Sequence, residues 1–268
     1  MKKQCAENAV RGCNYIYAPA GPAGEYAPLA CNPYRGCGHK CAYCYVPLIL
    51  HMKRPEFDKP ATARPAFIAH LTKDAKKYAA AKKTDQQVML SFTSDAYHPG
   101  DTSLTRETLV ALQSFGFGVC TLTKGGTRAL RDLDLFRPER DAFASTMTSL
   151  DDAFSLKWER AAALPADRIE ALKAFHEAAI FTWVSLEPTL DCESSLAIVQ
   201  ATHEFVDLFK VGKANYLGEY GKKTDWKDYT LRMIDLCSKL RVGHYIKDSL
   251  QEYLPAGYPN VLRQEQHR

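Results

Sequence analysis

The sequence contains no long apolar run. No stretch of its 268 residues approaches the roughly 20 apolar residues that span a bilayer. The opening MKKQCAENAVRGCNY has no apolar signal core, so we expect a cytoplasmic protein without a membrane partner. The chain also has little excess of charge of one sign. Its net charge of +4 is too small to indicate nucleic acid by itself. Without repeats, low-complexity tracts or a clear linker, residues 1–268 are expected to form a single domain.

Cysteine, by contrast, is plentiful. Nine cysteines in a cytoplasmic chain do not indicate a disulfide framework, because that compartment keeps thiols reduced. Four of them lie in CNPYRGCGHKCAYC, residues 31–44, and Cys37, Cys41 and Cys44 have the spacing CxxxCxxC. Zinc is usually held by four ligands in CxxC pairs, and the sequence has no second pair; the spacing of Cys31 matches no common zinc knuckle. A cubane cluster normally takes four thiolates, so three would leave one iron open. The spacing therefore favours a three-thiolate iron–sulfur cluster over zinc or structural thiols.

Short apolar runs alternate with amphipathic ones after the cysteines. The runs 87–93, 117–123, 141–147, 180–186 and 205–211 are rich in β-branched or aromatic residues, which predicts strands. The segments near 63–82, 104–115, 165–179, 192–203 and 226–240 are predicted helices. This alternation predicts an α/β fold with a parallel sheet closed into a barrel or partial barrel. We expect a lead-in over 1–30, a barrel core over 31–211 and a C-terminal extension over 212–268.

Polar residues follow every predicted strand. The segments are TSDAYHP, TKGG, TSLDD, EPTLD and GKANY. In barrels of this kind the chemistry lies at the C-terminal ends of the strands. A zwitterionic amino acid bound there needs a cation beside its carboxylate and an anion or hydroxyl beside its ammonium. Asp95 or Ser94 and Lys124 or Arg168 offer such groups. Three of the candidate residues also have a structural alternative to ligand binding. Lys124 is then a solvated loop lysine, Arg168 is a surface arginine, and Ser145 caps a turn.

The cysteine loop resembles that of the radical S-adenosylmethionine enzymes. CxxxCxxC after the first barrel strand, with the aromatic Tyr43 before the last cysteine, is their signature. The resemblance implies a partial (β/α) barrel and a 4Fe–4S cluster on Cys37, Cys41 and Cys44, whose open iron binds S-adenosylmethionine. It implies reductive cleavage of S-adenosylmethionine to a 5′-deoxyadenosyl radical, which abstracts hydrogen from a substrate. A one-electron reductant such as flavodoxin or ferredoxin is the implied partner.

Within that superfamily, the segment from the cluster to about residue 190 resembles the spore photoproduct lyase branch. The similar stretches are CGHKCAYCY, TSD, TK, FAST and WERAAALPADRIEAL. The resemblance implies a catalytic part in hydrogen-atom transfer for Tyr45. It implies cofactor contacts for Tyr43, Thr93, Ser94, Asp95, Lys124, Ser145, Arg168 and Glu187. One position departs from the pattern: the lyase has a hydrogen-donating cysteine directly before TSD, and this chain has Phe92, so we expect no repair of that lesion.

Three functions remain open on the sequence. The first is a radical enzyme acting on a nucleic-acid base or nucleotide, as the resemblance suggests, with slight support from the lysine-rich helix of residues 71–83. The second is radical modification of a peptide or a small anionic metabolite, received by basic strand ends that include Lys210, Lys213, Asn215 and Lys247. The third is a non-catalytic iron–sulfur module, which the polar residues beyond the cysteines argue against.

Overall fold

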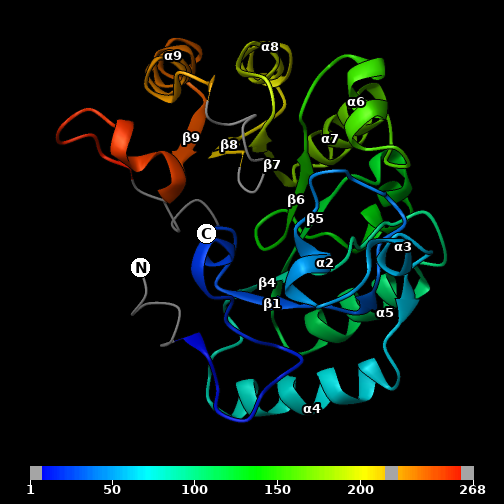
Figure 1. Cartoon of the computed structure of the whole chain (residues 1–268). Helices are drawn as coiled ribbons and strands as arrows, with labels where there is room; N and C mark the ends of the chain where they lie inside the picture. The colour runs from blue at the N-terminus through cyan, green and yellow to red at the C-terminus, as the bar shows by residue number, and fades with distance from the viewer. Residues whose placement is uncertain (1–7, 215–222, 261–268) are drawn as a thin grey trace.

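The computed structural model describes residues 8–214 and 223–260, and a sheet of seven strands forms its centre (Figure 1). Every neighbouring pair of these strands is parallel. The strands lie side by side in chain order: β1 (Leu29–Cys31), β4 (Gln87–Leu90), β5 (Gly118–Thr123), β6 (Ala142–Thr146), β7 (Phe181–Thr189), β8 (Leu208–Lys213) and β9 (Gly243–Ile246). The sheet is open between β1 and β9, so the predicted partial (β/α) barrel is confirmed.

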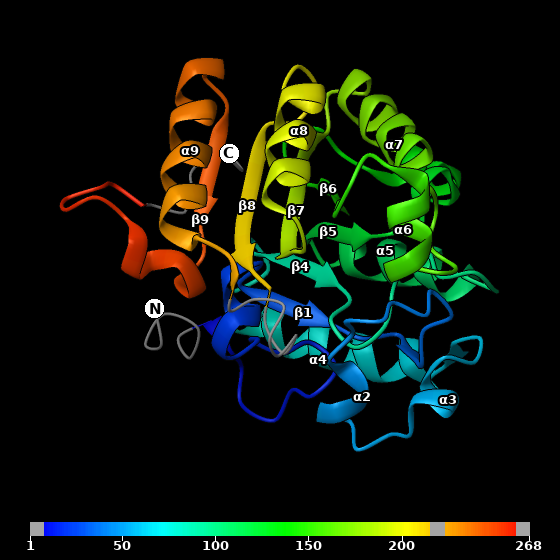
Figure 2. The same ribbon diagram turned by 45° about the horizontal axis from the view of Figure 1, so that its top comes forward.

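Helices cover the outer face of the sheet, as Figure 2 shows. They are α4 (Phe67–Ala80), α5 (Ser103–Ser114), α6 (Asp152–Trp158), α7 (Pro165–Glu177), α8 (Cys192–Thr202) and α9 (Trp226–Leu240). The larger apolar core lies between these helices and the strands. Phe175 of α7, for example, stacks on Phe143 of β6 with ring centroids 3.9 Å apart. The burial of Phe175 and of the other apolar side chains on the same face of α7 holds this helix to the sheet.

Several element boundaries differ from the predicted ones for local reasons. The strand predicted over 87–93 ends at Leu90, because the side chain of Asn32 accepts the amides of Phe92 and Thr93 at 2.8 and 3.1 Å. The helix predicted from residue 63 begins at Phe67, after Pro65 and a left-handed residue. The segment predicted as a strand from 205 first turns, and β8 begins at Leu208.

The sheet continues beyond residue 211. β8 runs to Lys213, and β9 pairs with it from Leu208↔Gly243 to Val211↔Ile246. The sequence did not predict β9, because GHYI is short and carries no apolar run. A 3₁₀-helix, η4 (Asp248–Tyr253), follows β9, and another, η2 (Gly126–Leu135), follows β5. Asn215, named above as a candidate substrate contact, lies outside the described residues.

The lead-in is tied to both edges of the open sheet. Asp74 of α4 accepts three successive backbone amides from residues 14, 15 and 16, at 2.8, 2.7 and 3.2 Å. Further along, Tyr17 pairs with Ala30 of β1 in an antiparallel bridge, and the 3₁₀-helix η1 (Gly21–Glu25) brings Glu25 to the last strand. There the carboxylate of Glu25 accepts the Asp248 amide at 2.7 Å and the Tyr245 hydroxyl at 3.2 Å. The lead-in therefore bridges the gap that the seven strands leave.

A smaller core lines the inner face of the sheet. It contains Ala30, Met89, Cys120, Ala144 and Trp183, among others, and the ring of Phe92 packs against it. Cys120 is fully buried there, as predicted for a strand cysteine. None of the helices within residues 8–214 and 223–260 has the length and apolar character to cross a membrane.

Candidate functional site

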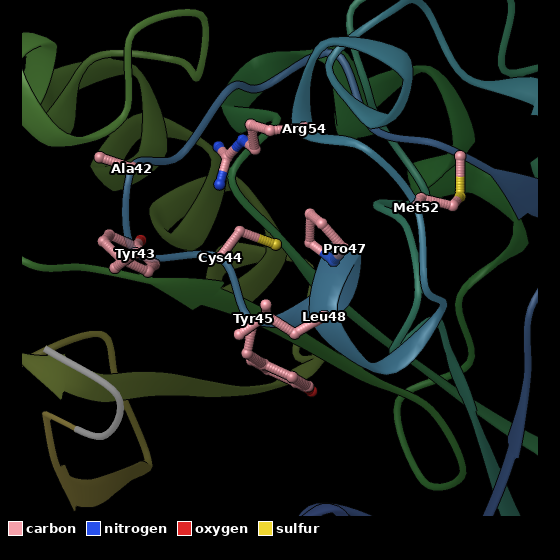
Figure 3. A pocket seen from close by; sticks show the side chains of 8 residues that line it. All are labelled: Ala42, Tyr43, Cys44, Tyr45, Pro47, Leu48, Met52 and Arg54. Atoms are coloured by element: carbon pink, nitrogen blue, oxygen red, sulfur yellow. The ribbon is translucent and has the colours of Figure 1, made fainter.

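The three clustered cysteines lie on an excursion at the C-terminal end of β1. The excursion contains the two-stranded ribbon of β2 (Tyr34–Arg35) and β3 (Thr62–Ala63), with the short helices α2 (Val46–Ile49) and α3 (Arg54–Phe57) between them. Cys37 precedes the turn, and its amide donates to the carbonyl of Phe57 at 3.0 Å. Cys44 lies two residues before α2 and lines a cavity of about 300 Å³ (Figure 3). The loop is thus fixed to α3 on one side.

The chemistry of the three thiols fits an iron–sulfur cluster. None of them is in a disulfide. Burial raises the pKa of Cys41 to about 12, and the pKa of Cys37 is raised by burial, by Asp95 and by the nearby thiols of Cys41 and Cys44. The thiols therefore lie near one another and are protonated, so cluster binding would release protons. Within the described residues, no three His, Cys, Asp or Glu side chains are grouped closely enough to hold a metal ion as they stand. The ligand set stays a prediction.

A segment that follows α6 holds the cysteine loop from the other side. We call residues 158–161 the strap. The amide of Ala42 donates to the carbonyl of Trp158 at 2.7 Å, and the amide of Ala161 donates to the backbone carbonyl of His39 at 3.0 Å. Between them, Cys41 pairs with Glu159 in an antiparallel bridge. Three backbone interactions therefore position the loop against the barrel. These interactions could not be predicted from the sequence, because backbone groups pair whatever side chains they carry.

The strap also carries a buried ion pair. Glu159 and Arg168 have side chains that are 0% and 1% exposed, and a guanidinium nitrogen lies 2.5 Å from a Glu159 oxygen. The same guanidinium donates to the carbonyls of Thr146 and Ala163, each at 2.8 Å. The other Glu159 oxygen accepts the hydroxyl of Tyr43. The sequence suggested Arg168 as a cofactor contact, but its guanidinium is committed to Glu159 and two carbonyls within the protein.

Glu159 is a residue that the sequence did not single out. Burial works to raise the pKa of its carboxyl, but Arg168 and then Lys124 hold that pKa below its usual value. The carboxylate is therefore ionised and links Tyr43, between two cysteines, to helix α7. A signal was present in WERAAALPADRIEAL, which contains both Glu159 and Arg168, but the spacing of nine residues predicts no contact by itself.

Asp95 joins the ends of β4 and β5. Its carboxylate accepts the hydroxyl of Thr123 at 2.5 Å, the amide of Lys124 at 2.8 Å and the amide of Tyr97 at 2.8 Å. An imidazole nitrogen of His39, in the cysteine loop, lies 3.2 Å away. Burial opposes ionisation, yet His39 and the hydrogen bonds hold the pKa of Asp95 well below its usual value. This carboxylate is saturated by protein donors, so it organises the strand ends instead of presenting a free anion.

The other hydroxyl candidates lie at the same edge of the sheet. The Ser94 hydroxyl donates to the carbonyl of Gly36 at 2.5 Å, directly before Cys37. Ser145 is buried at the end of β6 and donates to the carbonyl of Thr123 at 3.2 Å. Thr93 is fixed through its amide by Asn32. These residues come together as their strand-end positions predicted.

Lys124 is the cation nearest the cysteine loop on this edge. Its ammonium lies 5.6 Å from the centre of the Tyr43 ring. Burial lowers the pKa of Lys124, but Cys41 and Glu159 more than offset this and leave it raised, so the side chain is charged. Among the described residues, no carboxylate lies within ion-pair distance of this ammonium, so it has capacity for an incoming carboxylate.

Glu187 belongs to a second group of polar side chains, near the C-terminal end of β7. Its carboxylate accepts the hydroxyl of Tyr26 at 2.5 Å and pairs with Lys247, whose ammonium also lies 3.5 Å from Glu25. Both partners come from segments outside the predicted cofactor site. The structure therefore pairs Glu187 with the lead-in and with the residue that follows β9, and its role as a cofactor contact stays a prediction.

Lys210 is buried beside this group. Its ammonium donates to the carbonyls of Glu25 and Tyr26 at 3.2 and 2.8 Å and lies 4.4 Å from the centre of the Trp183 ring. Burial lowers the pKa of Lys210 to about 8. Lys213, by contrast, lies against Trp226 and Tyr253 at the end of β8. Lys210 and Lys247 are therefore buried on the inner face, and Lys213 is not.

A parallel partial barrel with three thiols on the loop after its first strand, a buried cation beside them and polar strand ends has the layout of a cofactor-dependent α/β enzyme. The chain belongs to the Radical SAM superfamily, whose sequence model matches residues 31–194. Membership makes it a radical S-adenosylmethionine enzyme and implies S-adenosylmethionine, an iron–sulfur cluster and a reductant.

Solved structures share the fold. SuiB from Streptococcus suis, bound to S-adenosylmethionine, is 14% identical with a TM-score of 0.62, over 84% of this chain and 52% of SuiB. Spore photoproduct lyase complexed with a dinucleoside spore photoproduct is 15% identical with a TM-score of 0.66, over 88% of this chain and 79% of the lyase. This chain spans about half the length of SuiB. A comparison with curated proteins found no match.

Proposed function

We propose that this chain holds a 4Fe–4S cluster through Cys37, Cys41 and Cys44, binds S-adenosylmethionine beside Lys124, and abstracts hydrogen from a nucleic-acid base or nucleotide. Bound together, the two groups supply a one-electron cleavage of the sulfonium that yields a hydrogen-abstracting 5′-deoxyadenosyl radical. The observation that carries the proposal is the placement of three disulfide-free thiols next to a charged lysine that has no carboxylate partner in the described residues.

The residues of the chain would bind and orient the cofactors. Lys124 would pair with the methionine carboxylate, and Ser94 and Ser145 offer hydroxyls at the neighbouring strand ends. Asp95 would keep the ends of β4 and β5 in register through its three hydrogen-bond donors and the nearby imidazole of His39. Arg168 would act through Glu159 and Tyr43 as a positioning residue, in place of the direct contact suggested by the sequence. Tyr45, at 40% exposure, would serve hydrogen-atom transfer.

The nucleic-acid substrate is supported by the fold shared with spore photoproduct lyase, which was solved with a dinucleoside photoproduct. Repair of that lesion is not part of the proposal. Phe92 packs into the inner face, with its ring centre 6.0 Å from that of Tyr26. A phenyl ring has no weakly bound hydrogen to return to a carbon radical, whereas a thiol has one. Cys120 lies in the same inner core, yet it is fully buried in a strand.

A peptide substrate is the second candidate. SuiB bound to its precursor peptide SuiA has the same fold, with a TM-score of 0.60 over 84% of this chain. The inner face here has aromatic rings around Lys210, whose ammonium donates to two backbone carbonyls; such a cation suits a peptide carboxylate or another small anion.

The cluster is tested by iron and sulfide analysis after anaerobic reconstitution. Cys37→Ala, Cys41→Ala and Cys44→Ala should each lose most of the iron, since each removes one of three thiolate ligands. Cys31→Ala is the matched control, because Cys31 lies in the same stretch but is buried in β1. Loss of iron in Cys31→Ala together with a full cluster in Cys41→Ala would contradict the ligand set. Wild-type protein should then form 5′-deoxyadenosine from S-adenosylmethionine and dithionite.

The substrate class is tested by binding and by isotope transfer. Single-stranded DNA should bind with an affinity that falls steeply from 50 to 200 mM salt, because phosphate contacts release counterions. Deuterium from a labelled oligonucleotide should appear in 5′-deoxyadenosine. Deuterium transfer from a peptide pool, with none from the oligonucleotide, would favour the second candidate.

A further inference from the structure

An exposed apolar patch adjoins the cysteine loop. Leu48, Ile49 and Leu50 are 68%, 56% and 36% exposed, and Tyr45, just before α2, is 40% exposed. The other large apolar side chains that are exposed in the described residues are separated from one another along the chain: Val110, Leu150, Leu156, Leu164 and Leu231. Consecutive exposed aliphatic residues on a soluble domain mark an interaction site more often than chance exposure.

The patch adjoins a cavity that Cys44 lines. The cavity of about 300 Å³ is lined by Ala42, Tyr43, Cys44, Tyr45, Pro47, Leu48, Met52 and Arg54 (Figure 3). One wall is therefore the cysteine loop and the other is α2. Figure 2 shows α2 and α3 at the periphery of the molecule, with no other helix covering them. A partner seated on α2 would lie within a few residues of a predicted cluster ligand.

Exposed cations outnumber exposed carboxylates in the excursion that carries the patch. In the segment 35–60 the exposed charged side chains are Arg35, Lys40, Lys53 and Lys59, against a single exposed carboxylate, that of Glu56. Arg54 is partly buried, pairs with Asp58 at 2.9 Å and donates to the carbonyl of Cys41, which fixes α3 to the loop. A small apolar centre with a basic rim complements a partner with an acidic rim.

We propose that this surface, Tyr45 and Leu48–Leu50 together with the exposed cations Arg35, Lys40, Lys53 and Lys59 of the same excursion, docks a small acidic one-electron carrier protein. The proposal rests on the proposed function, because it needs a cluster on the cysteine loop. One electron leaves the reduced flavin or iron–sulfur group of the carrier and enters the cluster, and no bond forms or breaks. The three consecutive aliphatic side chains favour a protein over a nucleic acid, since bases stack on aromatic side chains and the patch offers only Tyr45. The small area suits a weak, transient redox encounter.

The test compares two double variants with equal changes in charge. Ile49→Glu with Lys53→Glu alters the patch. Lys227→Glu with Leu231→Glu places the same substitutions four residues apart on α9, where both side chains are exposed. The probe is a purified acidic flavodoxin. We measure the rate at which its reduced form reduces the cluster, and, on the chain with and without cluster, its affinity by fluorescence anisotropy.

The patch variant should lose at least about tenfold in the reduction rate and affinity at low ionic strength, and the loss should shrink as salt screens the charges. The α9 variant should change less than about twofold. Dithionite, which needs no docking site, should drive formation of 5′-deoxyadenosine equally in all three proteins.

Three outcomes would overturn the docking proposal or separate it from the proposed function. Equal losses in the two variants would show that the effect is only net charge. Loss of single-stranded DNA binding, with flavodoxin binding unchanged, would assign the surface to nucleic acid. Failure of the wild-type protein to cleave S-adenosylmethionine with dithionite would refute the proposed function, and the anisotropy titration would still decide whether flavodoxin uses this surface.

Discussion

Removing the guanidinium of Arg168 should destabilise the protein strongly. Arg168→Met deletes hydrogen bonds to Glu159, Thr146 and Ala163 and leaves the carboxylate of Glu159 buried without its nearest cation. Breaking a buried pair by removing one partner costs about 3–5 kcal/mol of the free energy of unfolding. With a urea dependence of about 3 kcal/mol per M, the unfolding midpoint should fall by roughly 1–1.7 M.

The assay is urea unfolding of the protein without cofactors, followed by tryptophan fluorescence. Arg168→Met with Glu159→Gln should recover about 2 kcal/mol or more relative to the single variant, because no uncompensated charge remains buried. Arg232→Met is the control. Its partner Glu193 lies at a comparable 2.6 Å, but the two side chains are 44% and 69% exposed, so the loss should stay below about 1 kcal/mol. An Arg168→Met loss no larger than that of the control, or no recovery in the double variant, would refute the reasoning.

Three further predictions concern single side chains. Lys124→Ala should weaken binding of S-adenosylmethionine by about 1.5–3 kcal/mol with normal iron content, and unchanged affinity by calorimetry would remove Lys124 from the site. The folded pKa of Lys210 is about 8 and its usual value is 10.5, so the unfolded chain binds more protons between these pH values. The free energy of unfolding of the wild type should therefore rise by about 3 kcal/mol from pH 8 to 10.5, relative to that of Lys210→Met. If urea titrations give the two proteins the same pH dependence, the lowered pKa is wrong. Finally, the dinucleotide spore photoproduct should not be converted to thymines, and multiple turnovers that Cys120→Ala abolishes would contradict the reading of Phe92.

The sequence predicted the parts of the site that depend on local pattern. Cys37, Cys41 and Cys44 are recognisable from spacing alone, and Ser94 and Lys124 from their positions directly after apolar strands. The parallel order of the strands also followed, because strand–helix alternation leaves few other arrangements. The helix over 226–240 was predicted with its observed bounds.

What the sequence did not predict depends on pairing between distant residues. Tyr43 meets Glu159 across 116 positions, and the strap contacts the loop through backbone groups whose identity the sequence does not record. Asp95 was expected at the cofactor site, and its three hydrogen bonds and the contact with His39 are visible only when strand ends, loop and turn are assembled. Glu187 illustrates the same limit, since its partner Lys247 follows a short strand that no apolar run marks.

The bridge between η1 and β9 has a consequence for the order in which the protein folds. Glu25 bonds to groups 220 and 223 residues later in the chain. At a synthesis rate of about 5–20 residues per second, these partners leave the ribosome roughly ten to fifty seconds after Glu25 does. Until then the Glu25 carboxylate lacks the groups that it binds, although Tyr26 already has partners in β7 and β8. The N-terminal segment, although made first, can complete the barrel only after β9 has formed.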